Sequence, residues 1–392
     1  MLDKGRMLDV IVVGAGPAGL YAALLLAEEG FDVAVLEEHE VLGMPTHCTG
    51  IVSDEVSDLF KIPESVVLNR PSVCSVVSPS GRVVPFASNG ERIAVIDRGQ
   101  FDLELGSAAR QAGAEIKLGF RVDRVWTDLG CAQVSGPQGE GARARACILA
   151  CGVGYRLQRQ LGLGLPSLVL HSAQVEVDAG TAGTAVELHV GQRTAPDGFA
   201  WLVPVVRDGR LRMKVGLMTR GNAADHLSRF LSERAVVERL ASEPAVPIRR
   251  LLPLGPVAKT HGHRVLVIGD AAGLTKPTTG GGIFYGLLSG FLAAETLGEA
   301  LRRDRLGDEH LRDYETRWRA RLDPHLRVSS YLRRLFMNLT DVEIETLLQA
   351  IVADEVQEVI RRTAQFNWHG EMIRCILRQR GIRSILLHAL LR

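Results

Sequence analysis

A glycine-rich segment near the amino terminus has the residue types and spacing of a phosphate-binding turn. It follows an apolar, β-branched run at residues 10–13, which predicts a buried parallel strand, and it precedes an apolar helical pattern at residues 20–29. Gly14 would allow the tight turn, Gly16 would let the backbone approach a pyrophosphate, and Gly19 would let helix and strand pack closely. The unpaired N–H groups at the start of the helix would face the phosphates.

An acidic residue completes this unit. A second apolar run at residues 33–36 predicts another strand and ends in Glu37, where a carboxylate can accept hydrogen bonds from a ribose. Strand, turn, helix, strand and acid stand in the order of a βαβ dinucleotide unit. Residues 9–53 therefore predict dinucleotide binding.

Composition narrows the class of protein. The length of 392 residues exceeds a typical single domain, so we expect either two closely packed domains or one domain with insertions. The composition, 46% hydrophobic and 23% charged, is typical of a globular protein with a large core. The net charge is +1 and no basic block interleaves with aromatic residues, so we expect no nucleic-acid partner. The six cysteines lack metal-binding spacing, so we expect no metal site. The first strand follows a short charged leader and no apolar run is long enough for a spanning helix, so a cytoplasmic location is expected.

The chain alternates between two kinds of pattern. Turn signals and short apolar runs predict antiparallel strands within 66–97 and 169–218, with a hairpin at Asp208-Gly209 and one helix at about 224–242. We expect an α/β fold with a Rossmann-like nucleotide-binding domain, an inserted antiparallel β-sheet domain for the substrate, and a helical C-terminal region. The expected boundaries are 1–70, 98–154 and 255–300 for the nucleotide domain, 71–97 and 155–254 for the inserted domain, and 301–392 for the helices.

A second glycine-rich motif appears late in the chain. The β-branched run at 264–268 leads into Gly-Asp-Ala-Ala-Gly at 269–273 and then into a Pro- and Gly-rich turn before an apolar helix. With the first motif, this pattern resembles the glutathione-reductase-type FAD fold, in the class of the aromatic hydroxylases. The resemblance implies that Asp270 binds a ribityl hydroxyl. The helix that starts at Gly282 and Ile283 would point its positive end at the flavin, where negative charge accumulates on reduction.

Three stretches, 43–50, 196–204 and 269–295, resemble the geranylgeranyl reductase family of FAD-dependent prenyl reductases. The first is similar to that family's G-x-P-x-x-C-x-G loop, and the second to its P-x-x-Y-x-W-x-F-P motif. Phe199 replaces the Tyr and Val203 the Phe of that motif, which implies a reshaped pocket. The FAD contacts that the two motifs and the resemblance imply are Gly14, Gly16, Pro17, Ala18, Gly19, Glu37, Cys48, Thr49, Arg98, Val122, Asp270, Gly281, Gly282 and Ile283.

Reduction of an isolated alkene needs a hydride donor and a proton. The resemblance implies that N5 of the reduced flavin supplies the hydride. The protein would orient the substrate, exclude water from the pocket and supply an acid. Cys48 is the candidate catalytic thiol, as a proton relay or in a redox-linked disulfide; alternatively it only packs on the flavin. His47 is a candidate substrate-side acid, or an ordinary polar loop residue. Phe199 and Trp201 either line the prenyl pocket or belong to a core.

Other residues also have two interpretations. Arg98 contacts the FAD or forms a plain salt bridge. Residues 372–392 carry five arginines and no acid among apolar residues, so they either lie on an anionic membrane surface at the inner face or dock on their own domain.

The function that we expect is FAD-dependent saturation of a polyprenyl chain, with the substrate's head group open. The electron donor would be NADPH or reduced ferredoxin, acting transiently, because no second Gly-x-Gly-x-x-Gly is present. The alternatives are a flavin-dependent monooxygenase or halogenase and a non-catalytic, flavin-bound lipid-binding protein. Against the monooxygenase, the Asp-Gly pair of the hydroxylases is replaced by Cys151-Gly152. The sequence leaves the oligomeric state open.

Overall fold

The computed structural model describes residues 6–86, 90–181 and 185–390. The chain forms two compact units, each built from three separate stretches. The first unit comprises residues 1–46, 98–168 and 253–324, and the second comprises 47–97, 169–252 and 325–392. The helical region expected at 301–392 is thus divided after Pro324, inside one long helix.

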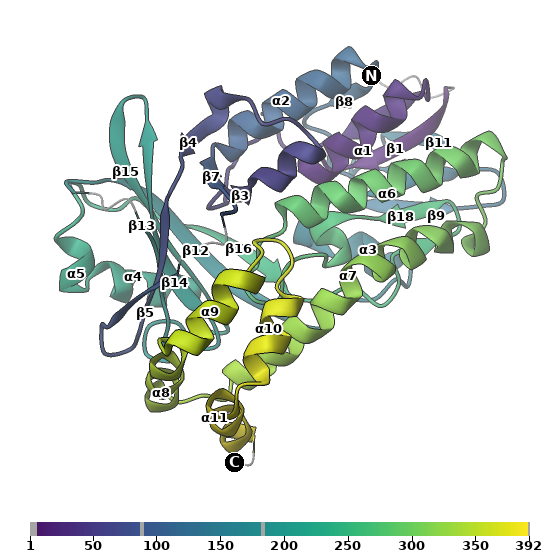
Figure 1. Cartoon of the computed structure of the whole chain (residues 1–392). Helices are drawn as coiled ribbons and strands as arrows, with labels where there is room; N and C mark the ends of the chain where they lie inside the picture. Colours follow the sequence, from purple (N-terminus) through teal and green to yellow (C-terminus); the bar gives the residue numbers. More distant parts are fainter. Residues whose placement is uncertain (1–5, 87–89, 182–184, 391–392) are drawn as a thin grey trace. The chain divides into compact units, whose positions relative to one another are not determined.

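A largely parallel sheet forms the centre of the first unit (Figure 1). Its strand order is β17 (His261–Gly262), β18 (Val265–Val267), β11 (Gly141–Leu149), β1 (Met7–Val13), β2 (Val33–Leu36) and β8 (Glu115–Lys117), and β10 (Ala132–Ser135) and β9 (Arg124–Thr127) extend β11 as an antiparallel hairpin. Val10, Ile11 and Val12 are fully buried, because β1 is flanked on both sides by parallel partners. The buried parallel strand predicted at residues 10–13 is therefore confirmed.

Helices pack on this sheet through small residues. The unit contains α1 (Pro17–Glu28), α2 (Arg98–Gln111), α3 (Arg156–Gln160), α6 (Ile283–Arg302) and the first part of α7 (Asp308–Phe336). Helices α1 and α6 lie side by side (Figure 1). A Cβ atom on Gly290 of α6 would lie only 2.8 Å from the carbonyl oxygen of Ala18, so the two backbones approach closely because this residue is glycine.

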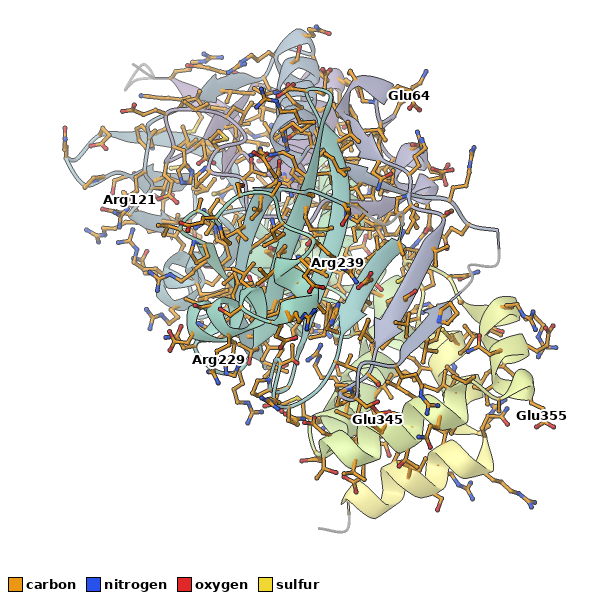
Figure 2. All side chains as sticks on the ribbon, turned by 90° about the vertical axis from the view of Figure 1, so that its left-hand side faces the viewer. Glu64, Arg121, Arg229, Arg239, Glu345 and Glu355 are labelled. Carbon is orange, nitrogen blue, oxygen red and sulfur yellow. The ribbon has the colours of Figure 1, made fainter. Side chains whose placement is uncertain are left out.

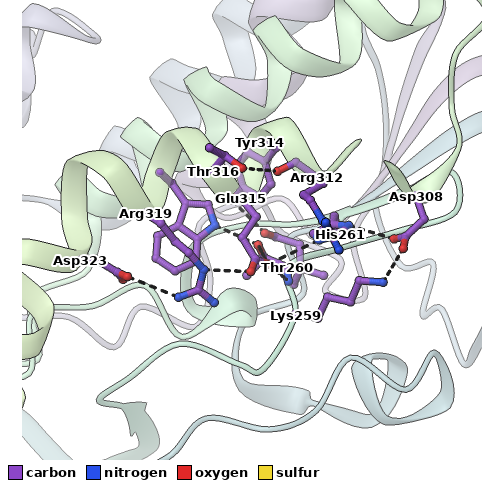
Figure 3. A network of polar contacts seen from close by, with 12 residues as sticks. Lys259, Thr260, His261, Asp308, Arg312, Tyr314, Glu315, Thr316, Arg319 and Asp323 are labelled. Atoms are coloured by element: carbon purple, nitrogen blue, oxygen red, sulfur yellow. Dashed lines mark hydrogen bonds and ion pairs between the residues drawn. The ribbon is translucent and has the colours of Figure 1, made fainter. Parts of the chain in front are cut away.

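A polar network fastens α7 to the edge of the sheet (Figure 3). The Thr260 hydroxyl donates to Glu315 Oε2 at 2.9 Å and accepts from Trp318 Nε1 at 2.9 Å. Buried His261 contacts Asp308 at 2.9 Å, and Arg319 contacts the other oxygen of Glu315 at 2.8 Å. Each of these polar groups has a hydrogen-bond partner, so burying them costs little free energy of folding.

The second unit contains a seven-stranded sheet. Its order is β16 (Ile248–Pro253), β12 (Val169–Asp178), β15 (Arg210–Thr219), β14 (Phe199–Arg207), β13 (Ala185–His189), β5 (Val73–Val77) and β6 (Val83–Phe86). The hairpin predicted at Asp208-Gly209 joins β14 to β15, and both turn residues have positive φ angles. Strands β5 and β13 pair in parallel, whereas β12 with β15, β15 with β14, β14 with β13 and β5 with β6 pair in antiparallel fashion.

The helix predicted at about 224–242 is wrong in extent. The structure has α4 (Ala223–Leu231) and a short α5 (Arg234–Val237), separated at Glu233, whose backbone is extended with ψ at 133°. Helix α4 covers one face of the sheet, where Leu227 and Phe230 join a core cluster with Val175 and Val215. Because the chain changes direction at Glu233, Val236 of α5 joins the same core cluster.

Short strands and the C-terminal helices complete the second unit. Strands β3 (Ile51–Ser53), β7 (Ile93–Ile96) and β4 (Val67–Asn69) form a small sheet. The end of α7 is followed by α8 (Asp341–Ile351), α9 (Asp354–Thr363), α10 (Gly370–Leu377) and α11 (Arg380–Leu390). Glu345 of α8, labelled in Figure 2, accepts a hydrogen bond from the Ser80 backbone at 2.7 Å and so ties α8 to the β5–β6 turn. One of the turn signals within 66–97 is Ser88-Asn89-Gly90, and Ser88 and Asn89 lie outside the described residues.

Candidate functional site

In the first unit, the three glycines of the first motif have different surroundings. Gly14 has a φ of +106°, and a Cβ there would lie 2.4 Å from the Ala150 carbonyl oxygen. A Cβ on Gly19 would lie 2.2 Å from the Gly14 carbonyl oxygen, so this position holds helix and turn together. Gly16 has no atom within 4 Å of the Cβ position. The turn is therefore closed on the sheet side and open at Gly16, where a ligand's phosphates can approach the backbone.

The start of α1 is suited to an anion. Gly16 is the N-cap and makes no side-chain cap hydrogen bond, Pro17 is the first helical residue, and no acid lies in the first turn. Glu37 follows β2, and its Oε2 accepts a hydrogen bond from Ala15 N at 2.7 Å. The carboxylate therefore lies beside the turn, on the edge where open parallel sheets bind nucleotides.

The second motif forms a short 3₁₀ helix, η4 (Gly269–Ala272), after β18. Three side chains hold its backbone: Ser289 Oγ accepts from Gly269 N at 3.0 Å, Tyr155 donates to the Asp270 carbonyl at 2.8 Å, and Gln158 donates to the Ala271 carbonyl at 3.1 Å. In the part of the chain that the structure describes, no donor bonds to the Asp270 carboxylate. Burial raises the pKa of this carboxyl group, and the Arg98 guanidinium opposes the rise.

Asp270 lies at the start of α6. A Cβ on Gly282, the N-cap of α6, would lie 2.8 Å from Asp270 Oδ1, so glycine leaves room for the carboxylate. This helix start also has no side-chain cap, and Ile283 is its first residue. An open phosphate turn, two uncapped helix starts and the carboxylates of Glu37 and Asp270 fit FAD, with its pyrophosphate, ribose and ribityl hydroxyls.

The other expected FAD contacts in this unit have structural partners. Ala18 packs against η4, with its Cβ 3.0 Å from the position of a Cβ on Gly269. The Gly281 carbonyl accepts from Lys276 N at 3.0 Å. Arg98 begins α2 and forms a two-bond ion pair with Asp102, at 2.7 and 3.1 Å, and Val122 is buried. The structure thus brings Ala18, Arg98 and Asp270 into one region of the unit.

In the second unit, the face of the sheet opposite α4 is partly polar. Cross-strand pairing places residues in rows over β14, β15 and β12: Trp201, Gly216 and Gln174 form one row, and Val203, Lys214 and Glu176 form the next. Since side chains alternate along a strand, these residues share the face that the core cluster leaves free. Trp201 Nε1 reaches across Gly216 and donates to Gln174 Oε1 at 3.2 Å.

The segment that carries Cys48 lies on this face. Gln174 Nε2 donates to the Cys48 carbonyl at 3.4 Å, and the Thr49 hydroxyl donates to Gln174 Oε1 at 3.2 Å. Lys214 Nζ donates to the Thr49 carbonyl at 2.8 Å. Cys48 is a free, half-buried thiol. Side chains from two strands therefore hold the segment that directly follows the thiol.

His47 is held less closely. Its Nε2 lies 3.5 Å from Ser172 Oγ. Burial and the neighbouring Arg250 lower the pKa of the imidazole to about 4. The ring is therefore neutral near pH 7, which favours the interpretation of His47 as a polar loop residue over that of a charged acid.

Two residues of this cluster were missed from the sequence. Gln174 and Lys214 are separated by forty positions, and only the register of β12 with β15 brings them together. One signal for Lys214 was present: a lysine stands inside the apolar run Met213 to Met218 of a predicted strand. Phe199 lies beside Trp201 in an edge-to-face contact at 5.9 Å on the same face.

Known proteins share this architecture. Residues 12–58 match the family model described as an NAD(P)-binding Rossmann-like domain. The fold is similar to that of a geranylgeranyl bacteriochlorophyll reductase-like protein from Thermoplasma acidophilum, with a TM-score of 0.85 and 21% identity over 98% of both chains. It is also similar to that of a mutant of halogenase PltM in complex with FAD, with a TM-score of 0.71 and 16% identity over 99% of this chain and 92% of the halogenase. The chain thus has the fold of these proteins.

Sequence similarity is more specific. Over 376 residues the chain is 30% identical to digeranylgeranylglycerophospholipid reductase 2 of Methanopyrus kandleri, a match that covers 90% of this chain and 92% of the relative. The chain belongs to the geranylgeranyl reductase family. The resemblance inferred from the three sequence stretches is confirmed.

Proposed function

We propose that this protein saturates the isolated double bonds of geranylgeranyl chains carried on a glycerophospholipid. The observation that carries this proposal is the full-length similarity to a relative named for that substrate. The face of the second unit's sheet that lies opposite α4 supports it. A thiol, two aromatic rings and Val203 lie together there, as the reduction of an apolar chain requires.

The residues have separate tasks in this proposal. When FAD is bound, it would supply the hydride that an unactivated alkene needs. Phe199 and Trp201 orient the prenyl chain and exclude water, and Cys48 Sγ holds the proton that the second carbon receives. Gln174 keeps the thiol in place through the Cys48 carbonyl.

Replacement of Cys48 by Ala tests the assignment of the proton. We expect Cys48→Ala to keep its flavin absorbance and lose most of its lipid saturation, because the thiol is removed while both glycine motifs remain. Saturation at the wild-type rate would show that Cys48 only packs in the site.

The first-unit structure weakens the monooxygenase alternative. The position of the hydroxylases' acid is held by Cys151, whose thiol lies beside Gln158 and whose pKa burial raises to about 11. No carboxylate is available at that position. NADPH-stimulated oxygen uptake, or halogenation of a phenolic substrate by the FAD-loaded protein, would support the alternative.

The electron donor in our proposal is transient, either NADPH or reduced ferredoxin. Anaerobic mixing of the FAD-loaded protein with each donor distinguishes them by the rate at which the flavin's visible absorbance disappears. Reduction by neither would reject both donors.

In our proposal, the arginines of residues 372–392 attach the protein to the anionic cytoplasmic face of the membrane. None of the described helices is both long and apolar enough to span a bilayer. The apolar side chains of α10 and α11 pack in their own unit, where Ile376, Ile382 and Leu386 join a core cluster, whereas Arg378 and Arg383 are exposed. The apolar side chains of α10 and α11 are therefore used for packing within their own unit, which is the simpler of the two interpretations of residues 372–392.

A vesicle experiment tests this attachment. We expect the wild type to sediment with anionic phospholipid vesicles at low salt, and Arg378→Glu with Arg383→Glu to sediment less. Equal sedimentation of both proteins would reject a role for the C-terminal arginines.

Substrate comparison tests the proposed function itself. Anaerobic, dithionite-reduced protein is incubated in parallel with digeranylgeranylglycerophospholipid and with geranylgeranyl diphosphate, and the products are examined by mass spectrometry. We expect the phospholipid to be saturated faster. No hydrogen addition to either compound would reject the proposed function, and saturation of the diphosphate alone would reject the phospholipid as its substrate.

A further inference from the structure

A short apolar loop lies exposed on the second unit, directly before β16. Residues 244–248 have the sequence Pro-Ala-Val-Pro-Ile, and residues 243–247 have no regular secondary structure. Val246 is 91% exposed and Ile248 is 39% exposed, whereas Pro247 is half-buried. Single exposed apolar side chains are ordinary, but a run of five consecutive apolar residues at the surface indicates a contact with another apolar body.

The loop is held at both ends by the second unit. Ala241 N donates to the carbonyl of the last residue of β12 at 2.8 Å. At the other end, Ile248 begins β16, which lies beside β12 in the sheet. Pro244 and Pro247 fix two of the φ angles between these ends and lack N–H groups. The loop therefore presents Val246 to solvent with little conformational entropy left to lose on binding.

Two arginines follow the apolar run. Arg249 is exposed and Arg250 is half-buried, and neither guanidinium forms an ion pair with a residue that the structure describes. Arg250 donates to the Arg249 carbonyl at 3.3 Å. The acid of the loop, Glu243, stands before the apolar run and not beside these arginines. Positive charge without a carboxylate partner therefore adjoins Ile248, and this arrangement suits the phosphates of anionic lipids.

The loop leads to the edge of the candidate site in the same unit. The Ser172 hydroxyl donates to the Arg250 carbonyl at 3.3 Å. Ser172 lies in the cross-strand row of Phe199, and its Oγ is 3.5 Å from His47 Nε2. An extended chain covers at most about 3.6 Å per residue, so Arg250 lies no more than about 14 Å from Val246. A contact made by Val246 is therefore close to the row that contains Phe199.

We propose that residues 244–250 are a docking loop for an anionic lipid bilayer. Val246 and Ile248 enter the boundary between the head groups and the acyl chains, and Arg249 contacts lipid phosphates. A bilayer fits this surface better than a protein partner does, because one short loop is far smaller than a stable protein interface and because the arginines adjoin it. Binding of the bilayer is independent of the proposed function; only the use of this contact to bring a lipid to the site rests on that function.

Vesicle binding tests the loop without any turnover. FAD-loaded protein is sedimented at low and at high salt with vesicles of equal parts phosphatidylglycerol and phosphatidylcholine, and with vesicles of phosphatidylcholine alone. Val246→Asp removes the apolar tip, and Arg249→Gln removes one charge but keeps a polar side chain. Val342→Asp, at a 75% exposed valine of α8 in the same unit, is the matched control. Flavin absorbance and the urea midpoint show whether each variant is folded.

We expect Val246→Asp to weaken partition into the anionic vesicles by at least about tenfold at both salt concentrations, because the apolar contact is not screened. Arg249→Gln should weaken it by about fivefold at low salt and have little effect at high salt. Val342→Asp should bind like the wild type. Vesicles of phosphatidylcholine alone should bind the wild type more weakly than the anionic vesicles do.

Three results would overturn the proposal: no partition of the wild type, wild-type partition of Val246→Asp, or an equal loss of binding in Val342→Asp. A change in the sedimentation velocity of vesicle-free Val246→Asp would also overturn it, because the loop would then be a contact with a second copy of the chain. Loss of binding in Val246→Asp, in a protein that reduces no prenyl lipid, would reject the proposed function and leave this inference standing.

Discussion

Gly216 is the position where one added methyl group should disturb the candidate site most. It lies between Trp201 and Gln174 in one cross-strand row, and the indole ring covers it. A Cβ at Gly216 would lie 2.5 Å from Cζ2 and 2.8 Å from Nε1 of Trp201. Ordinary contact begins at 3.4 Å, so the rigid ring must move by about 0.9 Å in Gly216→Ala.

The size of the effect follows from this displacement. Overpacking of this kind costs about 1–3 kcal/mol. The ring moves away from a hydrogen bond that is already 3.2 Å long, so Gln174 loses the indole donor. Gln174 also holds Cys48 and Thr49, and we therefore expect the thiol segment to loosen. Activity should fall by more than the loss of stability alone implies.

Two assays check this prediction against a matched control. Gly180→Ala lies in the same unit, where the nearest atom to an added Cβ is 3.9 Å away. We expect Gly216→Ala to unfold at a lower denaturant concentration and to saturate lipid at least about tenfold more slowly, and Gly180→Ala to behave like the wild type. If Gly216→Ala matched the wild type in both assays, Trp201 would not have the packing and the role described above.

Three further substitutions test other parts of the structure. Gly14→Ala should abolish copurification of FAD, because the residue has a φ of +106° and an added Cβ meets the backbone; normal flavin absorbance in the purified variant would contradict this. His47 has a pKa of about 4 in the folded chain, below its ordinary value of 6.5, so the unfolded chain binds more protons between these values and stability falls as the pH drops. As the pH drops from 7 to 4, the free energy of unfolding of His47→Gln, measured in denaturant titrations, should therefore rise relative to that of the wild type by on the order of 3 kcal/mol. A difference that stays constant over this range would refute the lowered pKa of His47. Thr260→Val removes the acceptor for Trp318 and a donor to Glu315, so the free energy of unfolding should fall by about 1–3 kcal/mol; an unchanged urea midpoint would show that the network in Figure 3 adds no stability.

The nucleotide-binding part was predictable because its signals are local. The β-branched runs at 10–13 and 33–36 become buried parallel strands, and Gly14 and Gly19 occupy positions where a Cβ would meet the backbone. These residues stand close together in the chain, and their spacing alone specifies the turn. The hairpin at Asp208-Gly209 was predictable for the same reason.

The second unit's cluster depends on distant contacts. Gln174, Trp201 and Lys214 come from three strands, and their meeting depends on a register that no local pattern encodes. The prediction of one helix at about 224–242 was wrong for a related reason. Its apolar residues suit one continuous helix, but covering the sheet requires a break at Glu233.

The central claim is tested most directly by following flavin and lipid in one anaerobic reaction. FAD-loaded protein is reduced without excess reductant and mixed with digeranylgeranylglycerophospholipid, and both the flavin's visible absorbance and the lipid mass are recorded with time. Our account predicts that each flavin oxidised yields one lipid double bond saturated, with the product heavier by two hydrogens. A flavin that stays reduced while the lipid mass does not change would contradict it.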